Sequence, residues 1–146
     1  MIAVDTNVLV HAHVTASPLH AAATKRLQAL TADAAGWAIP VCCLSEFVRV
    51  VTHPRLLQLP LSEKTARTAV EALLAAPSVR VLCPGEQFVS LFLAALEESG
   101  ARGNLVFDCQ IVAVCREAGV RALLTEDRDF ARFDSFPVQR LSRGSV

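Results

Sequence analysis

The chain has no long hydrophobic run, although apolar residues dominate its composition. Of its 146 residues, 53% are hydrophobic, and the mean hydropathy is +0.42. No uninterrupted apolar stretch approaches the roughly 18 to 20 residues that a membrane span requires. The N-terminus also lacks a basic stretch ahead of an apolar segment, and Asp5 interrupts the only candidate. We therefore expect a cytoplasmic protein with no signal peptide and no membrane association.

Cys-x-x-Cys pairs and an excess of positive charge are also absent. The five cysteines are odd in number and lie in apolar surroundings, which favours free core thiols over a zinc site or a catalytic thiol. They are Cys42, Cys43, Cys83, Cys109 and Cys115. The formal net charge is zero, which argues against strong non-specific adhesion to nucleic acid but allows a local basic rim.

Short apolar runs alternate with helical patterns along the chain, which is typical of an α/β fold with a mostly parallel sheet flanked by helices. The runs predict four to five strands, at residues 2–4, 37–39, 79–82, 121–124 and 138–140. The periodic segments predict helices at residues 17–32, 40–52, 62–75, 85–98 and 104–117, with Ser17, Ser62 and Asn104 as N-caps. The helix at 85–98 is apolar on nearly every face, so we expect it to be either deeply buried or a dimer contact. No repeat or linker divides the chain, so we expect a single domain over residues 1–146.

Four acidic residues lie within apolar segments. Asp5 and Asp127 each follow a predicted strand directly, and the carboxyl ends of parallel strands share one edge of the sheet. Glu46 and Asp108 share helical faces with apolar residues, so both side chains are expected to point toward the sheet. An unpaired carboxylate beside buried surface is costly. We therefore predict that these four acids meet in one cleft and hold a cation.

Each acid also has a purely structural explanation. Asp5 could cap a helix that starts just after it, and Glu46 could be neutralised by Arg49. Asp108 could stabilise a helix N-terminus, and Asp127 could start a turn. Because these explanations would have to coincide at one edge of the sheet, a joint site is favoured.

Carboxylates without an accompanying histidine or thiolate favour Mg²⁺ or Mn²⁺ over zinc or copper. Such an ion polarises a phosphoryl oxygen and activates a bound water for in-line attack on a phosphodiester. Thr6, Asn7 and Thr125 lie beside the acids in the sequence, so they could orient the carboxylates or metal-bound waters.

Three other conspicuous residues receive structural interpretations. His11 and His13 are two residues apart and would lie on different faces of a helix, so we expect surface or packing histidines rather than a transition-metal site. Trp37 heads a predicted strand, so we expect it in the core.

Four segments resemble, in order and approximate spacing, the PIN domain family and more narrowly the VapC toxins of bacterial toxin-antitoxin pairs. They are Val4–Leu9, Ser45–Phe47, Gly103–Asp108 and Thr125–Phe130. The resemblance covers the whole chain and implies a PIN-like α/β/α domain with Mg²⁺- or Mn²⁺-dependent endoribonuclease activity. It also implies a homodimer, held inactive by a VapB-type antitoxin that covers the acidic site. By position it assigns catalytic and metal-binding roles to Asp5, Glu46, Asp108 and Asp127, with Thr6, Asn7 and Thr125 as the accompanying polar residues.

The chain departs from this pattern in two places. The last segment offers both Asp127 and Asp129, and although the Thr-x-Asp spacing selects Asp127, Asp129 could share its role. Phe107 and Cys109 give Asp108 less polar neighbours than many relatives have. Arginines near the motifs could contact RNA phosphates, with an ordinary solvated surface as an equal alternative. They are Arg49, Arg55, Arg128 and Arg132.

The same residues allow or disfavour several other functions. A PIN ribonuclease that processes RNA outside a toxin-antitoxin pair, or an inactive PIN-like binding module, would share the fold. A phosphorylation-dependent receiver module needs a lysine near the end of its sheet, but the lysines here are Lys25 and Lys64. A haloacid-dehalogenase-type phosphatase needs a second Asp where Asn7 stands, and dinucleotide binding is disfavoured because Gly-x-Gly is absent.

Overall fold

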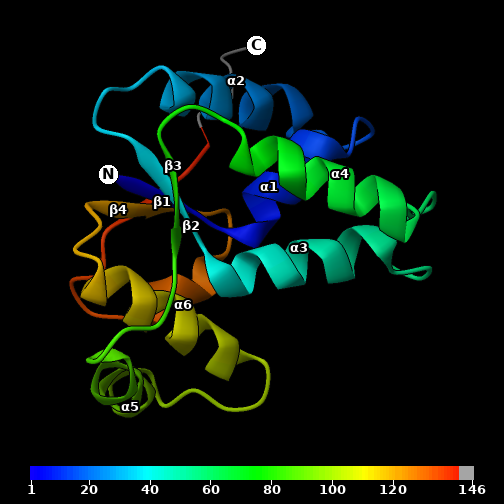
Figure 1. Cartoon of the computed structure of the whole chain (residues 1–146). Coiled ribbons are helices and arrows are strands. Elements are labelled where there is room, and N and C mark those ends of the chain that lie inside the picture. The colour runs from blue at the N-terminus through cyan, green and yellow to red at the C-terminus, as the bar shows by residue number, and fades with distance from the viewer. Residues whose placement is uncertain (142–146) are drawn as a thin grey trace.

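A five-stranded parallel sheet forms the centre of the computed structural model, which describes residues 1–141 (Figure 1). The strands are β1 (Ile2–Val4), β2 (Trp37–Pro40), β3 (Val79–Leu82), β4 (Ala122–Leu124) and β5 (Val138–Gln139). They run in the order β3-β2-β1-β4-β5, so β1 is the central strand. The predicted sheet is confirmed, with every strand end within one residue of its expected position.

Helices cover both faces of this sheet. They are α1 (Thr6–His13), α2 (His20–Thr31), α3 (Val41–Thr52), α4 (Glu63–Leu74), α5 (Phe88–Ser99) and α6 (Leu105–Glu117), with a short 3-10 helix, η1, at Arg128–Arg132. In Figure 1, α2 lies on one side of the sheet, and α6 lies on the other with α5 packed against it. Helices α3 and α4 form a hairpin that projects beyond the carboxyl ends of the strands. Within the described residues, none of these helices combines the length and hydrophobicity needed to cross a bilayer.

The central strands are apolar throughout because both faces of the sheet are covered. Every residue of β1 and β4 is buried. These two strands pair in parallel with Val4 opposite Leu124, and the Asp5 N–H donates to the Leu124 carbonyl at 3.0 Å. This register places the residues that follow β1 beside the residues that follow β4.

Capping chemistry explains the start of α4 but not the starts of α2 and α6. The Ser62 hydroxyl accepts from an amide in the first turn of α4, as predicted. The Ser17 hydroxyl instead accepts from the Leu19 N–H in a turn, and α2 begins only after that turn. Asn104 precedes α6 with a helical backbone, and its side chain caps nothing. The prediction of Ser17 as an N-cap is therefore wrong, whereas Asn104 does occupy the N-cap position of α6 but forms no capping hydrogen bond.

The core contains Trp37, as predicted, and most of the cysteines. Trp37 is 1% exposed, and its indole N–H donates to the Pro77 carbonyl at 3.3 Å. All five cysteines are free thiols, and Cys43, Cys109 and Cys115 are buried. Cys83 is exposed, so the prediction of a core thiol is wrong there. It follows β3, which lies at an edge of the sheet where few elements cover the chain.

Helix α5 is not deeply buried, so the expectation of deep burial for its apolar sequence is wrong. Its inner side carries Phe88 and Phe92, stacked at 5.9 Å between ring centroids and packed against the core, and Ala95 is fully buried. On its outer side Val89 and Leu93 are 63% and 58% exposed. The expectation of a dimer contact stays a prediction.

The position of β4 in the core gives a test of the fold. Leu123 is fully buried, so Leu123→Ala is expected to lower the free energy of unfolding by about 2 to 5 kcal/mol, because the removed atoms leave a cavity. The matched change Leu59→Ala, at a leucine that is 87% exposed in the α3–α4 loop, is expected to cost less than about 0.5 kcal/mol. Urea unfolding followed by circular dichroism measures both, and equal losses would contradict this placement of the core.

Candidate active site

Asp5 lies at the carboxyl end of β1 and is only 4% exposed. It is also the N-cap of α1, because its Oδ1 accepts from the Thr6 N–H at 2.7 Å. Its Oδ2 accepts from the Asn7 side-chain amide and from the Thr125 hydroxyl, both at 2.6 Å. The capping role and the place in the acid cluster therefore belong to the same side chain. Donors on both oxygens offset the loss of water around a buried carboxylate.

Thr125 and Asn7 join the segments that follow β1 and β4. The fully buried Thr125 hydroxyl donates to Asp5 and accepts from the Asp127 N–H at 3.0 Å and from the Asn7 amide at 3.0 Å. The side-chain Oδ1 of Asn7 accepts from the Glu126 N–H at 2.9 Å. These bonds fix the direction of the Asp5 carboxylate and of the backbone that carries Asp127.

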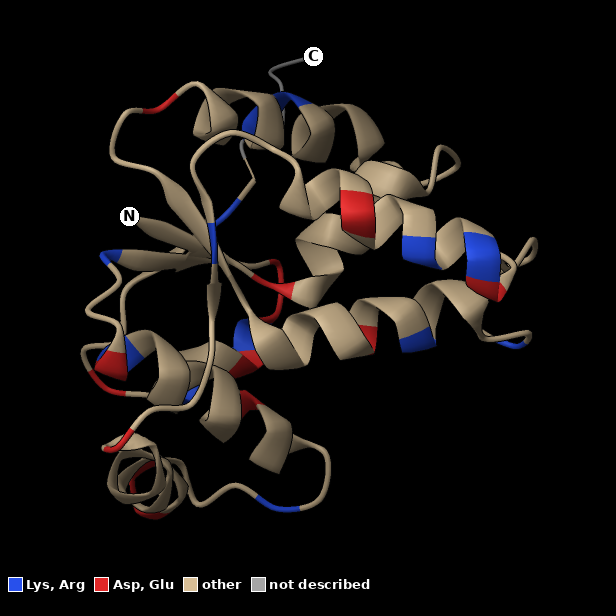
Figure 2. Ribbon diagram, viewed as in Figure 1, with Lys and Arg blue, Asp and Glu red and all other residues tan. Residues whose placement is uncertain are grey.

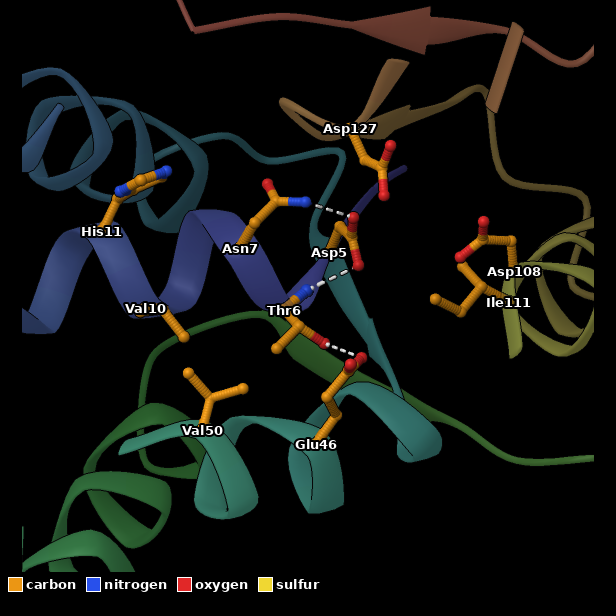
Figure 3. A pocket seen from close by; sticks show the side chains of 10 residues that line it. All are labelled: Asp5, Thr6, Asn7, Val10, His11, Glu46, Val50, Asp108, Ile111 and Asp127. Carbon is orange, nitrogen blue, oxygen red and sulfur yellow. Dashed lines mark hydrogen bonds between the residues drawn. The ribbon is translucent and has the colours of Figure 1, made fainter. Parts of the chain in front are cut away.

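Glu46 reaches the same place from α3. Its Oε2 accepts from the Thr6 hydroxyl at 3.0 Å, and its Oε1 lies 3.3 Å from Nη2 of Arg49. The two paired side chains are 40% and 60% exposed, so this ion pair adds little stability in water. Arg49 therefore pairs with only one carboxylate oxygen of Glu46. The other Glu46 oxygen faces Thr6 and Asp5 (Figure 3).

The four predicted acids line one cleft, which has two adjoining lobes. The smaller lobe, of about 260 Å³, lies between α1, α3 and α6, and the larger lobe, of about 660 Å³, lies between α3 and α6. Glu46, Asp108 and Asp127 line both lobes, whereas Asp5 lines only the smaller one and Asp129 only the larger. Figure 3 shows the side chains of the smaller lobe converging from different elements. The structure therefore brings the predicted acids together.

Asp108, Asp127 and Asp129 place one carboxylate oxygen each within 4.8 Å of the others. Asp108 comes from the first turn of α6, and Asp127 caps η1 by accepting from the Asp129 N–H at 2.8 Å. Asp129 also lies 3.7 Å from Arg132, and both side chains are about half exposed. Asp127 thus lines both lobes, whereas Asp129 lines only the larger one.

Two of these acids, Asp5 and Asp108, have raised pKa values. Burial raises the pKa of Asp108 to about 7, and the negative charges of its neighbours, led by Asp127, add to this effect. Burial also raises the pKa of Asp5, although the hydrogen bonds from Thr125 and Thr6 oppose the shift. A bound cation would stabilise the charged form of both carboxylates and so oppose the effects of burial and of the neighbouring negative charges.

The donor atoms suit a hard divalent cation. The groups that could hold it are carboxylates, and the nearest thiol, Cys43, acts as a donor to Asp5 Oδ1 at 3.7 Å. Hydrogen bonding to Cys42 and burial raise the pKa of the Cys43 thiol well above its usual range, so the thiol stays protonated and is no thiolate ligand. Oxygen donors of this kind fit Mg²⁺ or Mn²⁺ better than zinc.

Several cleft residues were not expected there from the sequence, and His11 is one of them. His11 lines the smaller lobe, with its Nδ1 2.7 Å from the Ser17 hydroxyl. It lies four residues after Asn7 on α1, and this spacing puts both on one face of the helix, a signal that could have found it. The packing role expected for His13 is confirmed, because its ring lies 5.0 Å from the Phe47 ring.

The arginines considered for RNA contacts are not all near the cleft. Arg49 lines the larger lobe, Arg132 pairs with an acid of that lobe, and Arg128 is exposed beside it. Arg55 lies beyond the end of α3 and lines neither lobe. Figure 2 shows the Lys and Arg positions spread over several elements, not gathered along one stripe. Their contacts with RNA stay a prediction.

Comparison with known proteins identifies relatives over nearly the whole chain. The PIN domain family model matches residues 2–135. A VapC ribonuclease of Mycobacterium bovis is 38% identical over 133 residues, which are 91% of this chain and 90% of that protein. Ribonuclease VapC48 of Mycobacterium tuberculosis is 32% identical over 135 residues, which are 92% of this chain and 93% of that protein.

Solved structures share the fold at lower sequence identity. VapBC2 from Rickettsia felis, bound to a DNA fragment from its promoter, has a TM-score of 0.69 and 17% identity and covers 96% of this chain and 98% of its own. Mycobacterium tuberculosis VapC20, described as a sarcin-ricin loop cleaving toxin, has a TM-score of 0.65 and 19% identity. The match covers 90% of this chain and 93% of the VapC20 chain. The family model and the relatives above 30% identity together establish that this chain belongs to the PIN domain family.

Proposed function

We propose that the protein is a metal-dependent endoribonuclease that acts as the toxin of a toxin-antitoxin pair. The convergence of Asp5, Glu46, Asp108 and Asp127 on one cleft is the observation that carries this function. Relatives up to 38% identical over nine tenths of the chain are named VapC ribonucleases, which supports RNA as the substrate. The reaction is hydrolysis of a phosphodiester bond in the RNA backbone.

The acids are proposed to hold Mg²⁺ or Mn²⁺. Asp108 and Asp127 are the main ligands in this proposal, with Asp129 as a further candidate, because their oxygens lie within 4.8 Å of one another. Asp5 and Glu46 complete the set from the other side of the smaller lobe. When bound, the ion polarises the phosphoryl oxygen and lowers the pKa of a water nucleophile.

The remaining polar residues position the acids. Thr125 and Asn7 hold one Asp5 oxygen, and Thr6 holds both the other Asp5 oxygen and Glu46. These contacts keep the carboxylates oriented toward the cleft before substrate arrives, which removes a reorganisation step from catalysis. Arg49, Arg128 and Arg132 are proposed to contact backbone phosphates along the rim, whereas the position of Arg55 gives it no support in this role.

We also propose the partners expected from the family resemblance. A VapB-type antitoxin would cover the acidic cleft, and the exposed Val89 and Leu93 on α5 support a homodimer through that helix. The PIN domain is proposed to span residues 1–146, since the family model already matches residues 2–135. Free cysteines throughout the described chain support a reducing compartment, the cytoplasm.

Removal of a ligand carboxylate tests the chemistry. Purified protein is expected to cleave RNA with Mg²⁺ or Mn²⁺, and Asp5→Asn or Asp108→Asn is expected to lower the cleavage rate by roughly 100-fold or more, because metal-ion catalysis is worth several kcal/mol. Asp134→Asn, at an exposed aspartate in the turn before β5, is the matched control and should cleave normally. Gel assays of labelled RNA measure the rates. Full activity in excess EDTA, or in either site variant, would refute the metal mechanism.

The raised pKa of Asp108 predicts how the metal-free protein responds to pH. An aspartate in the unfolded chain titrates near the ordinary value of 3.8, whereas folded Asp108 titrates at about 7. Between these values the folded protein binds a proton that the unfolded chain has lost, so the free energy of unfolding falls as pH rises through this window. Asp108→Asn should therefore raise the melting temperature in EDTA by about 2 to 4 °C near pH 8 and change it little near pH 4.

Calorimetry with and without metal checks this expectation. Mg²⁺ should raise the melting temperature of the wild type more than that of Asp108→Asn, because only the wild type offers the full ligand set. Asp134→Asn should follow the wild type at each pH. A variant that melts below the wild type near pH 8 without metal would show that Asp108 carries no unfavourable charge.

Expression in a bacterial host tests the toxin role. Wild-type protein produced without an antitoxin is expected to arrest growth, whereas Asp5→Asn at equal protein level is not, because the arrest requires cleavage. Sequencing of RNA 5′ ends after brief induction measures the new cleavage sites and names the target. Normal growth with the wild type would argue for an RNA-processing enzyme outside a toxin-antitoxin pair. New RNA ends in the Asp5→Asn cells would show that RNA cleavage does not depend on this site.

A further inference from the structure

Phe107 is an exposed aromatic side chain beside the acidic centre. It is 59% exposed, whereas every other phenylalanine is buried or half-buried. It lies in the first turn of α6, next to Asp108 in the chain, and it lines the larger lobe of the cleft. The core therefore does not account for this side chain.

Phe107 belongs to a polar and aromatic stripe on α6. Asn104, Phe107 and Gln110 follow one another at intervals of three residues, which places them on one face of the helix, and all three line the larger lobe. The side-chain amides of Asn104 and Gln110 form no hydrogen bond with any residue that the structure describes, so their donors and acceptors are free. Asp108 and Ile111 form the adjacent stripe, which lines both lobes.

We propose that the larger lobe binds one unpaired nucleobase of the RNA next to the bond that is cleaved, a role that rests on the proposed ribonuclease function. Phe107 stacks on the face of the base, and Gln110 and Asn104 hydrogen-bond to its edge. Arg49, 60% exposed on the opposite wall, meets the adjoining phosphate. Single-stranded RNA is bound in this way because bases outside a duplex expose both their faces and their edges.

The dimensions and lining of the lobe favour a base over a protein segment. Its volume of about 660 Å³ lies within the range of roughly 300 to 1,000 Å³ that is typical of small-ligand sites. Beyond the residues that it shares with the smaller lobe, its lining includes neutral hydrogen-bonding side chains and one aromatic ring, with Arg49 and Asp129 as its charged groups.

The test begins with a pool of single-stranded oligoribonucleotides that contain a random central tract. Cleavage with Mn²⁺ and sequencing of the new ends give the nucleotide preference of the wild type on both sides of the cut. Gln110→Ala is expected to weaken that preference at one position while cleavage continues, because base-edge contacts specify sequence. Leu59→Ala is the control for an exposed apolar residue elsewhere and should keep the wild-type pattern.

The decisive comparison combines a protein change with removal of the base. Phe107→Leu retains apolar bulk but has no aromatic face, so kcat/KM on one preferred oligoribonucleotide should fall roughly 10-fold or more, and Phe107→Trp should restore it. Copies of that oligoribonucleotide, each lacking the base of one nucleotide next to the cut, are then cleaved by both proteins. At one position, removal of the base should lower kcat/KM of the wild type by about the same factor as the Phe107→Leu change does on the intact RNA. Removal of the same base should lower kcat/KM of Phe107→Leu by little more.

The outcomes separate this subsite from the function on which it rests. Equal rates and equal preferences for wild type, Phe107→Leu and Gln110→Ala would refute the subsite while leaving the ribonuclease intact. If Phe107→Leu lowers kcat/KM by the same factor relative to the wild type on intact and on base-free RNA, and its mass in analytical ultracentrifugation also changes, Phe107 would belong to a protein interface instead. A wild type that cleaves no member of the pool with Mn²⁺ would refute the proposed function itself.

Discussion

The rest of the site depends on keeping a buried carboxylate, that of Asp5, hydrogen-bonded from every side. Loss of water around such a group costs several kcal/mol unless donors replace it. Here the donors come from α1, from Cys43 on α3 and from Thr125 after β4. Satisfying one carboxylate therefore forces three separate parts of the chain into a fixed arrangement. The other acids lie on those same parts, or beside them on α6, and they crowd together because Asp5 and its donors bring their elements together.

Helix α6 combines two tasks in its first turns. One stripe, with Asp108 and Ile111, faces the acids, and the next stripe, with Phe107 and Gln110, faces the larger lobe. A helix fixes the angle between neighbouring stripes, so a group held on one stripe stays at a constant distance from the other. The rigid backbone thus couples the position of a bound base to the position of the reacting phosphate, and the hydrophobic side of α6 anchors both to the sheet.

Strands, helices and the positions of the acids could be predicted from the sequence because they depend on local residue patterns. Features that depend on tertiary contacts could not. Continuous apolar runs located β1 and β4, so Asp5 and Asp127 could be placed at one edge of the sheet. The inward direction of Asp108 followed from helical spacing. The failed cap at Asn104 and the exposure of Cys83 could not be foreseen, because the local geometry at Asn104 and the position of β3 at the sheet edge are properties of the assembled fold. The exposed side of α5 could not be predicted for the same reason, because an apolar sequence does not reveal which face of the helix lacks a neighbour.

The hydrogen bond between Thr125 and Asp5 joins residues 120 positions apart in the chain. Asp5 therefore emerges from the ribosome well before the residues that orient it and complete its cluster. No truncated or partly synthesised chain that ends before this point can assemble the cleft. A chain under synthesis therefore cannot cleave RNA at this site until the segment after β4 has emerged and folded against Asp5.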